Sequence, residues 1–159
     1  MPSESARMSS ATEARYRIQA PNSKPRSISV IALDASSEAI LRRLAKSSWR
    51  HARFLTATAN VDGWLSDFAG GRRDLMDEVD TADLVVVVAT PGGHAQAASI
   101  VGEACSLRRV MTTALVVGAK SASDEAVSKT LAQVRPWSLM LVIANPDDYI
   151  DDMLVALQA

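Results

Sequence analysis

The run ADLVVVVAT at residues 82–90 contains four consecutive valines. A strand with one solvent-facing side alternates apolar and polar residues, whereas this run has no polar side. Such a run is typical of a central strand in a parallel sheet that has helices packed on both faces. The chain is therefore predicted to have an α/β architecture built on a parallel sheet.

The segments around this strand alternate between short apolar runs and amphipathic helical patterns. Single helices between strands produce right-handed crossovers and a doubly wound sheet. We therefore predict a three-layer, Rossmann-like α/β fold with a five-stranded parallel sheet in the flavodoxin-like order 2-1-3-4-5. The predicted strands cover residues 27–33, 53–58, 82–90, 111–118 and 138–144. The predicted helices cover residues 36–49, 72–81, 93–109, 123–134 and 146–157, and residues 61–71 are predicted to form a loop.

The 159 residues are enough for one domain with its own core and too few for two ordinary domains. Residues 1–26 have few large apolar side chains and no sustained period, which predicts a mobile tail. Residues 27–159 are predicted to form a single Rossmann-like domain.

The predicted tail also differs from the domain in charge. It carries five of the 17 basic side chains and only two of the 18 acidic ones. The domain itself is therefore acidic, and an acidic domain is not expected to bind nucleic acid.

The sequence contains one cysteine, Cys105, which excludes an internal disulfide and fits a reducing compartment. Its place on the apolar side of a predicted helix indicates a buried structural thiol. No apolar stretch approaches the roughly 20 residues of a membrane-spanning helix, and residues 1–26 lack the apolar segment of a secretory signal. We therefore expect no membrane association and a cytoplasmic location.

Ligands of doubly wound folds bind where the loops after neighbouring strands separate. In the predicted strand order these loops are LDASSE at residues 33–38 and ATPGGHA at residues 89–95. Gly92 and Gly93 would let the backbone approach an anion at a helix N-terminus. A glycine pair also serves a tight turn without any ligand, so both interpretations stay open.

Polar residues in the two loops add candidate ligand-binding groups. Thr90 offers a hydroxyl, and His94 offers a titratable ring beside the glycines. Asp34 is a candidate for binding Mg²⁺ or a ribose hydroxyl, and equally for starting the turn that follows it. The serines are expected mainly to cap the helix. The candidate ligand-binding residues are Asp34, Ser36, Ser37, Thr90, Gly92, Gly93 and His94, and no metal site is predicted.

Three further groups of side chains have both a structural and a functional interpretation. The acidic group suits the first turns of a helix and could also hold a cation. The basic group is either a solvated helix face or a surface for a partner or phosphate. The tryptophans are either core residues or interface anchors. The groups are Asp147, Asp148, Asp151 and Asp152; Arg42, Arg43, Lys46, Arg50 and Arg53; and Trp49, Trp64 and Trp137.

The chain contains, in this order, the segments ISVIALDASSEAILRRLAKS, FLTATAN, ADLVVVVATPGGHAQAASIVGEA and LMLVIANPDD. The order of these segments and their pattern of apolar runs and loops resemble the N-terminal, GTP-binding half of the tubulin/FtsZ family. The resemblance implies a nucleotide-binding α/β fold in which the loops after Leu33 and after Ala89 correspond to the phosphate loops.

The glycine-rich loops of that family are degenerate in this chain. The first loop has no glycine, and residues 94–97 replace the Thr-Gly-Thr-Gly part of the second. GTP hydrolysis is therefore not expected. The chain also lacks the G-x-G-x-x-G and G-x-x-x-x-G-K-[ST] patterns of other nucleotide sites.

These features predict a non-catalytic, Rossmann-like binding module that interacts with a partner protein or with a second copy of itself. A weak site for phosphate or sulfate is expected at Gly92–His94, with binding that strengthens as His94 becomes protonated. The alternative is a small enzyme that acts on a phosphorylated or carboxylated metabolite in the same crevice, with His94 as acid or base. The sequence indicates no particular cofactor.

Overall fold

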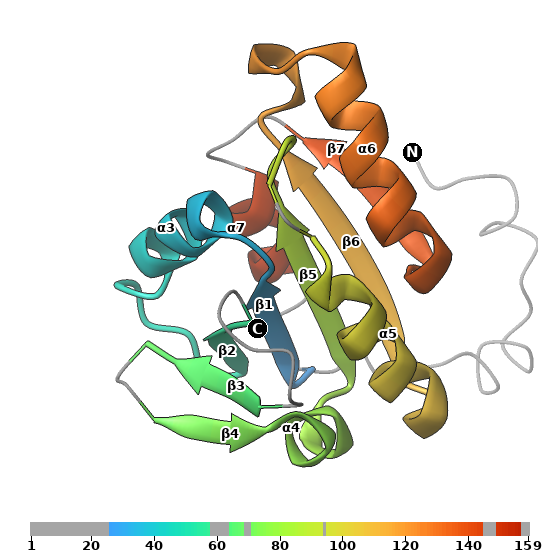
Figure 1. The fold of residues 1–159 in the computed structure, drawn as a ribbon. Coiled ribbons are helices and arrows are strands. Elements are labelled where there is room, and N and C mark those ends of the chain that lie inside the picture. Colours follow the sequence, from blue (N-terminus) through green and yellow to red (C-terminus); the bar gives the residue numbers. More distant parts are fainter. Residues whose placement is uncertain (1–25, 58–63, 69–70, 94, 145–148, 157–159) are drawn as a thin grey trace, which may run out of the picture.

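The computed structural model describes residues 26–57, 64–68, 71–93, 95–144 and 149–156 (Figure 1). Residues 1–25 of the predicted tail lie outside the described residues, as does His94. The predictions that concern them therefore stay predictions.

The described strands form a sheet in the order β4-β3-β2-β1-β5-β6-β7. β1 pairs in parallel with β2 and β5, and β6 and β7 continue the parallel part of the sheet. β3 and β4 run antiparallel at the opposite edge. The strands are β1 (Ile28–Ala32), β2 (Ala52–Thr56), β3 (Trp64–Asp67), β4 (Arg72–Asp74), β5 (Leu84–Ala89), β6 (Met111–Val117) and β7 (Met140–Ala144).

The α/β class is confirmed, but the predicted five-stranded, flavodoxin-like sheet is wrong, because the described sheet has seven strands. The additional strands, β3 and β4, arise from residues predicted as a loop and as the start of a helix. They form a hairpin in which the Asp67 N–H donates to the Gly71 carbonyl at 2.9 Å and Asp67 Oδ1 accepts from the Gly71 N–H at 2.7 Å. Strands of four and three residues are too short to show a clear alternating pattern.

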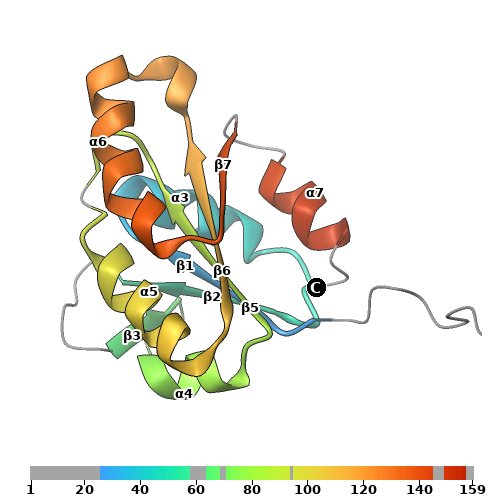
Figure 2. The same ribbon diagram turned by 90° about the vertical axis from the view of Figure 1, so that its right-hand side faces the viewer.

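Helices cover both faces of the sheet (Figure 2). One face packs against α3 (Ala35–Leu44) and α7 (Tyr149–Ala156), and the other against α4 (Leu75–Thr81), α5 (Ala97–Arg108) and α6 (Asp124–Val134). Two short 3₁₀ helices, η1 (Ala119–Ser121) and η2 (Arg135–Trp137), lie in the connections. No helix in the described part of the chain is both long and apolar enough to cross a membrane.

The four valines of β5 divide their side chains between the two faces. Val85 and Val87 belong to the core cluster that includes α5 and α6, whereas Val86 and Val88 belong to the cluster that includes α3 and α7. All four are buried. The prediction of a central strand covered on both faces is therefore confirmed.

Candidate functional site

A crevice of about 430 Å³ lies at the carboxyl ends of β1 and β5. The two loops proposed from the sequence meet there. Ser37, also predicted, is fully buried beside the crevice in the first turn of α3. The residues that line the crevice are Leu33, Asp34, Ala35, Ser36, Thr90, Pro91, Gly92 and Gly93.

Asp34 is the N-cap residue of α3. Its Oδ1 accepts a hydrogen bond of 2.8 Å from the Ser37 N–H, and the Ser37 hydroxyl oxygen accepts one of 3.2 Å from the Asp34 N–H. This reciprocal pair satisfies two backbone donors at the start of the helix. The sequence interpretation of Asp34 as the start of a turn and of Ser37 as a capping residue agrees with this geometry.

The Asp34 carboxylate also reaches across to the loop after β5. Its Oδ2 accepts from the Thr90 N–H at 2.7 Å, and its Oδ1 accepts from the Thr90 hydroxyl at 2.9 Å. Asp34 is only 7% exposed, so these hydrogen bonds are largely shielded from solvent. The carboxylate thus joins the two loops and takes a backbone donor that a bound anion would otherwise use.

The glycine pair has two structural reasons to be present. Gly92 has φ of +83°, a conformation that residues with a Cβ rarely adopt. A Cβ on Gly93 would lie 2.6 Å from Asp34 Oδ2, so the neighbouring carboxylate leaves no room for a side chain. Both glycines are therefore explained by the turn and by its contact with Asp34, without reference to a ligand.

Helix α6 holds the same loop through two side chains that the sequence did not single out. The Gly92 N–H donates to Thr130 Oγ1 at 3.1 Å, and the Ala95 N–H donates to Gln133 Oε1 at 3.2 Å. The Gly93 N–H donates to the Thr90 carbonyl at 3.1 Å. Nothing in the local pattern of α6 indicates these contacts, because they join residues 38 positions apart.

The helix after the glycines begins later than predicted. α5 starts at Ala97, and its N-cap residue, Gln96, makes no capping hydrogen bond through its side chain. Gly93 therefore lies before the helix rather than in its first turn. The described residues that line the crevice include one carboxylate and no lysine or arginine, so their electrostatic attraction for phosphate is weaker than the sequence interpretation assumes.

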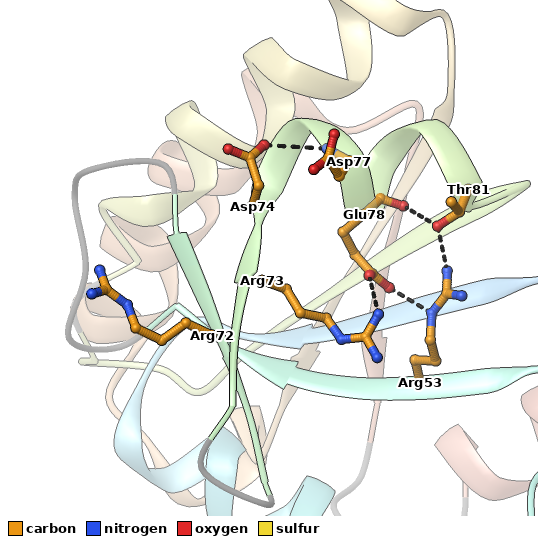
Figure 3. Close-up of a pocket in the computed structure, with 7 residues that line it drawn as sticks. All are labelled: Arg53, Arg72, Arg73, Asp74, Asp77, Glu78 and Thr81. Carbon is orange, nitrogen blue, oxygen red and sulfur yellow. Dashed lines mark hydrogen bonds and ion pairs between the residues drawn. The ribbon is translucent and has the colours of Figure 1, made fainter.

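A second pocket, of about 460 Å³, is lined by residues of β2, β4 and α4 (Figure 3). The buried Glu78 carboxylate accepts from Ser29 Oγ at 2.9 Å, from Arg53 Nε at 2.6 Å and from Arg73 Nη1 at 3.4 Å. Arg53 Nη2 also donates to Thr81 Oγ1 at 2.8 Å. These contacts tie α4 to β1, β2 and β4, which is a structural role.

The basic group proposed from the sequence is not a uniform surface. Arg53 is paired with Glu78, and Arg42 is paired with Glu38 at 2.8 Å while its guanidinium lies 4.6 Å from the centre of the Phe68 ring. The grouping of Arg53 with the solvent side of α3 is therefore wrong, because Arg53 lies on β2 and its guanidinium pairs with Glu78 of α4.

The other groups proposed from the sequence are mostly structural or lie outside the described residues. Trp49 is partly buried and donates from Nε1 to the Leu44 carbonyl at 2.8 Å, whereas Trp137 is 38% exposed. Cys105 is buried as predicted. Within the described part of the chain, no group of three or more His, Cys, Asp or Glu residues is placed to hold a metal ion. Asp147 and Asp148 and the side chains of Trp64 and Asp151 lie outside the described part.

The sequence matches no protein-family model and no curated protein sequence. Among solved structures, the fold is similar to translation elongation factor SelB from Methanococcus maripaludis. In the complex with the GTP analogue GPPNHP the TM-score is 0.52 at 10% identity, over 87% of this chain and 34% of the other. The apo form gives a TM-score of 0.52 at 8% identity, over 86% of this chain and 36% of the other. This chain thus spans about a third of the SelB chains, and the likeness shows a shared α/β fold but not the resemblance to the tubulin/FtsZ family.

Proposed function

We propose that the protein is a non-catalytic binding module with the fold of a nucleotide-binding protein, in which an internal carboxylate occupies the crevice. The observation that carries this proposal is the Asp34 carboxylate, which accepts hydrogen bonds from the Thr90 N–H and hydroxyl. Its binding partner is another protein or a second copy of the chain.

The fold and the two degenerate loops support a nucleotide-binding origin. SelB, whose solved structure holds a GTP analogue, has a similar fold, and the loop sequences resemble those of the tubulin/FtsZ family. In this chain, however, a phosphate in the crevice would face the carboxylate of Asp34. Two unit charges about 6 Å apart repel by roughly 1–3 kcal/mol at the effective dielectric constants of protein surfaces. Tight binding of a nucleotide triphosphate is therefore not expected.

A weak site for inorganic phosphate at Gly92–His94 remains part of the proposal. A protonated His94 would attract the anion, whereas the N–H groups of Gly92 and Gly93 already donate to Thr130 and Thr90 and Asp34 would oppose the anion, so binding would be weak. The enzyme alternative, with His94 as acid or base, is not proposed, because the N–H groups of Thr90, Gly92 and Gly93 that would hold its anionic substrate already donate to acceptors within the protein.

Substitution of Asp34 by asparagine tests the role of the carboxylate. In Asp34→Asn the repulsive charge is removed and an amide NH₂ faces the Thr90 N–H, which therefore loses its acceptor. Phosphate titrations followed by the loop amide signals in NMR spectra should show binding at least about tenfold tighter than in the wild type, as expected from the loss of one nearby charge.

Asp74→Asn is the matched control, because Asp74 is also an N-cap residue but lies at the end of β4, before α4, and does not line the crevice. It should leave phosphate binding unchanged. If Asp34→Asn keeps its folded spectrum and binds phosphate no better than wild type, the crevice is not an anion site.

Addition of Mg²⁺ and GTP or ATP should not raise the Tm of the wild type. A ligand that did bind, at 100 times its Kd, would add about 2.7 kcal/mol to the free energy of unfolding. A nucleotide-dependent rise in Tm would contradict the proposal that the Asp34 carboxylate prevents tight nucleotide binding.

A further inference from the structure

β7 forms one edge of the described sheet and presents an apolar surface. Leu139, immediately before the strand, is 77% exposed, and Ile143 within it is 52% exposed. Met140 is exposed as well. Trp137 on η2, Met111 at the start of β6 and Leu107 near the end of α5 are also exposed. We call Trp137, Leu139, Met140 and Ile143, together with the outer edge of β7, the β7 edge.

The two edges of the sheet differ in a way that bears on pairing. An edge strand offers unpaired backbone groups to another strand, and proteins usually protect it by a short length, charged side chains or a covering element. β4, at the opposite edge, has only three residues, and all of them, Arg72, Arg73 and Asp74, are charged. β7 has five residues with the sequence MLVIA and no charge. Among the described residues, the β7 edge therefore lacks the charged side chains and the short length that protect the β4 edge.

We propose that two copies of this chain pair through β7, antiparallel about a two-fold axis, so that their sheets become continuous. This inference rests on the proposed function as a binding module and specifies one surface and one partner. In an isologous interface the same patch meets itself, so any charge on the patch faces a like charge close to the axis. Residues 136–144 contain no charged side chain, so the strand can pair with itself without repulsion.

The start of the β7 edge is held in place before any partner binds. The backbone of α5 at Gly102 lies so close to Trp137 that a Cβ there would be 2.4 Å from Trp137 Cβ. The Leu139 N–H donates to the Thr112 carbonyl of β6 at 2.9 Å, which holds the chain against the sheet. A partner therefore meets a partly exposed tryptophan next to a formed strand, and such aromatic anchors are enriched at interfaces.

A lysine at position 143 tests the proposed pairing in the full chain. Sedimentation and light scattering should show the wild type as a dimer with a Kd in the range of about 1–100 µM. Because Ile143→Lys alters both copies and opposes two positive charges across the axis, the Kd should rise at least about 100-fold. Val155→Lys is the matched control, because Val155 is 64% exposed but lies on α7, and it should dimerise like the wild type.

Amide hydrogen exchange identifies what covers the edge. Residues 140–144 should become more protected as the wild-type concentration rises, and this dependence should be lost in Ile143→Lys. A monomer at all concentrations up to about 1 mM would overturn the proposal. Protection that does not depend on concentration would also overturn it, since it would show that the chain covers its own edge. Equal dimerisation of Ile143→Lys and wild type would place the interface elsewhere. The phosphate and nucleotide experiments do not involve β7, so each proposal can fail alone.

Discussion

At the scale of single residues, the crevice depends on the close approach of Gly93 to Asp34. A Cβ on Gly93 would lie 2.6 Å from Asp34 Oδ2, so Gly93→Ala forces the carboxylate away from its hydrogen bonds. We expect this substitution to lower the free energy of unfolding by about 1–3 kcal/mol, measured by urea denaturation. In an Asp34→Ala background the same substitution should cost less, because the carboxylate is gone and only the Cβ of residue 34, at 2.9 Å, still opposes the new Cβ.

Gly92→Ala is the control for backbone strain. Gly92 has φ of +83°, and the atom nearest to a Cβ there would be Ala126 Cβ at 3.8 Å. Its replacement should cost about 1–2 kcal/mol through the backbone alone. That cost should be the same with or without Asp34. Equal losses for Gly93→Ala in both backgrounds would mean that its contact with the Asp34 carboxylate is not the cause.

Cys105 is a second residue for which the structure allows a prediction, which concerns the ionisation of its thiol. Burial raises the pKa of its thiol, and a hydrogen bond with Thr112 lowers this pKa in part. The folded thiol therefore stays neutral at pH values where an unfolded thiol ionises. Its stabilising contribution is complete below the unfolded pKa of about 8.5 and decreases as the pH rises above it.

The rate of thiol modification by a disulfide reagent near pH 8 measures this directly, since the thiolate is the reactive form. The folded protein should react far more slowly than the urea-unfolded chain, and the rate should increase with urea as the protein opens. A native rate equal to that of the unfolded chain would show that Cys105 is accessible.

At the scale of secondary-structure elements, Glu78 connects α4 to three strands. The carboxylate is buried and accepts from Ser29, Arg53 and Arg73. Glu78→Gln keeps the size but removes the charge, and it should lower the free energy of unfolding by about 1–3 kcal/mol. The loss is smaller than for a fully buried ion pair because both arginine side chains reach solvent. Urea denaturation gives the value.

Asp80→Asn on the same helix is the matched control for Glu78→Gln. Asp80 pairs with Arg108 at 3.2 Å, and both side chains are well exposed. Such surface pairs contribute about 0–1 kcal/mol. If the two substitutions cost the same, the buried network does not hold α4 in place.

At the scale of the whole molecule, the crevice and the β7 edge are separate features. The crevice lies at the carboxyl ends of β1 and β5 in the middle of the sheet, whereas β7 lies at its edge. Pairing through β7 would extend the sheet and leave the crevice open to solvent. The two proposed interactions therefore involve separate surfaces, and neither excludes the other.

The sequence alone determined the elements whose signal is local. The valine run predicted a strand buried on both faces, because each of its side chains has to be covered. The amphipathic pattern predicted α3 and α6, since both helices place apolar residues on one side. The alternation of strands and helices predicted the α/β class, because single crossovers bring parallel strands together. The location of the crevice between two loops followed from the same rule.

Only the tertiary structure decided the features that join distant residues. The hairpin of β3 and β4 forms by pairing with β2 and not by a pattern of its own. Asp34 and Thr90 are 56 positions apart. Their hydrogen bonds show that the loop predicted to bind an anion is a turn whose donors bind a carboxylate of the protein itself. Arg53 and Glu78 are 25 positions apart, and their ion pair removes Arg53 from the expected basic surface. A sequence pattern reports which face of an element is apolar, whereas the partner of a polar side chain depends on how the elements pack against one another.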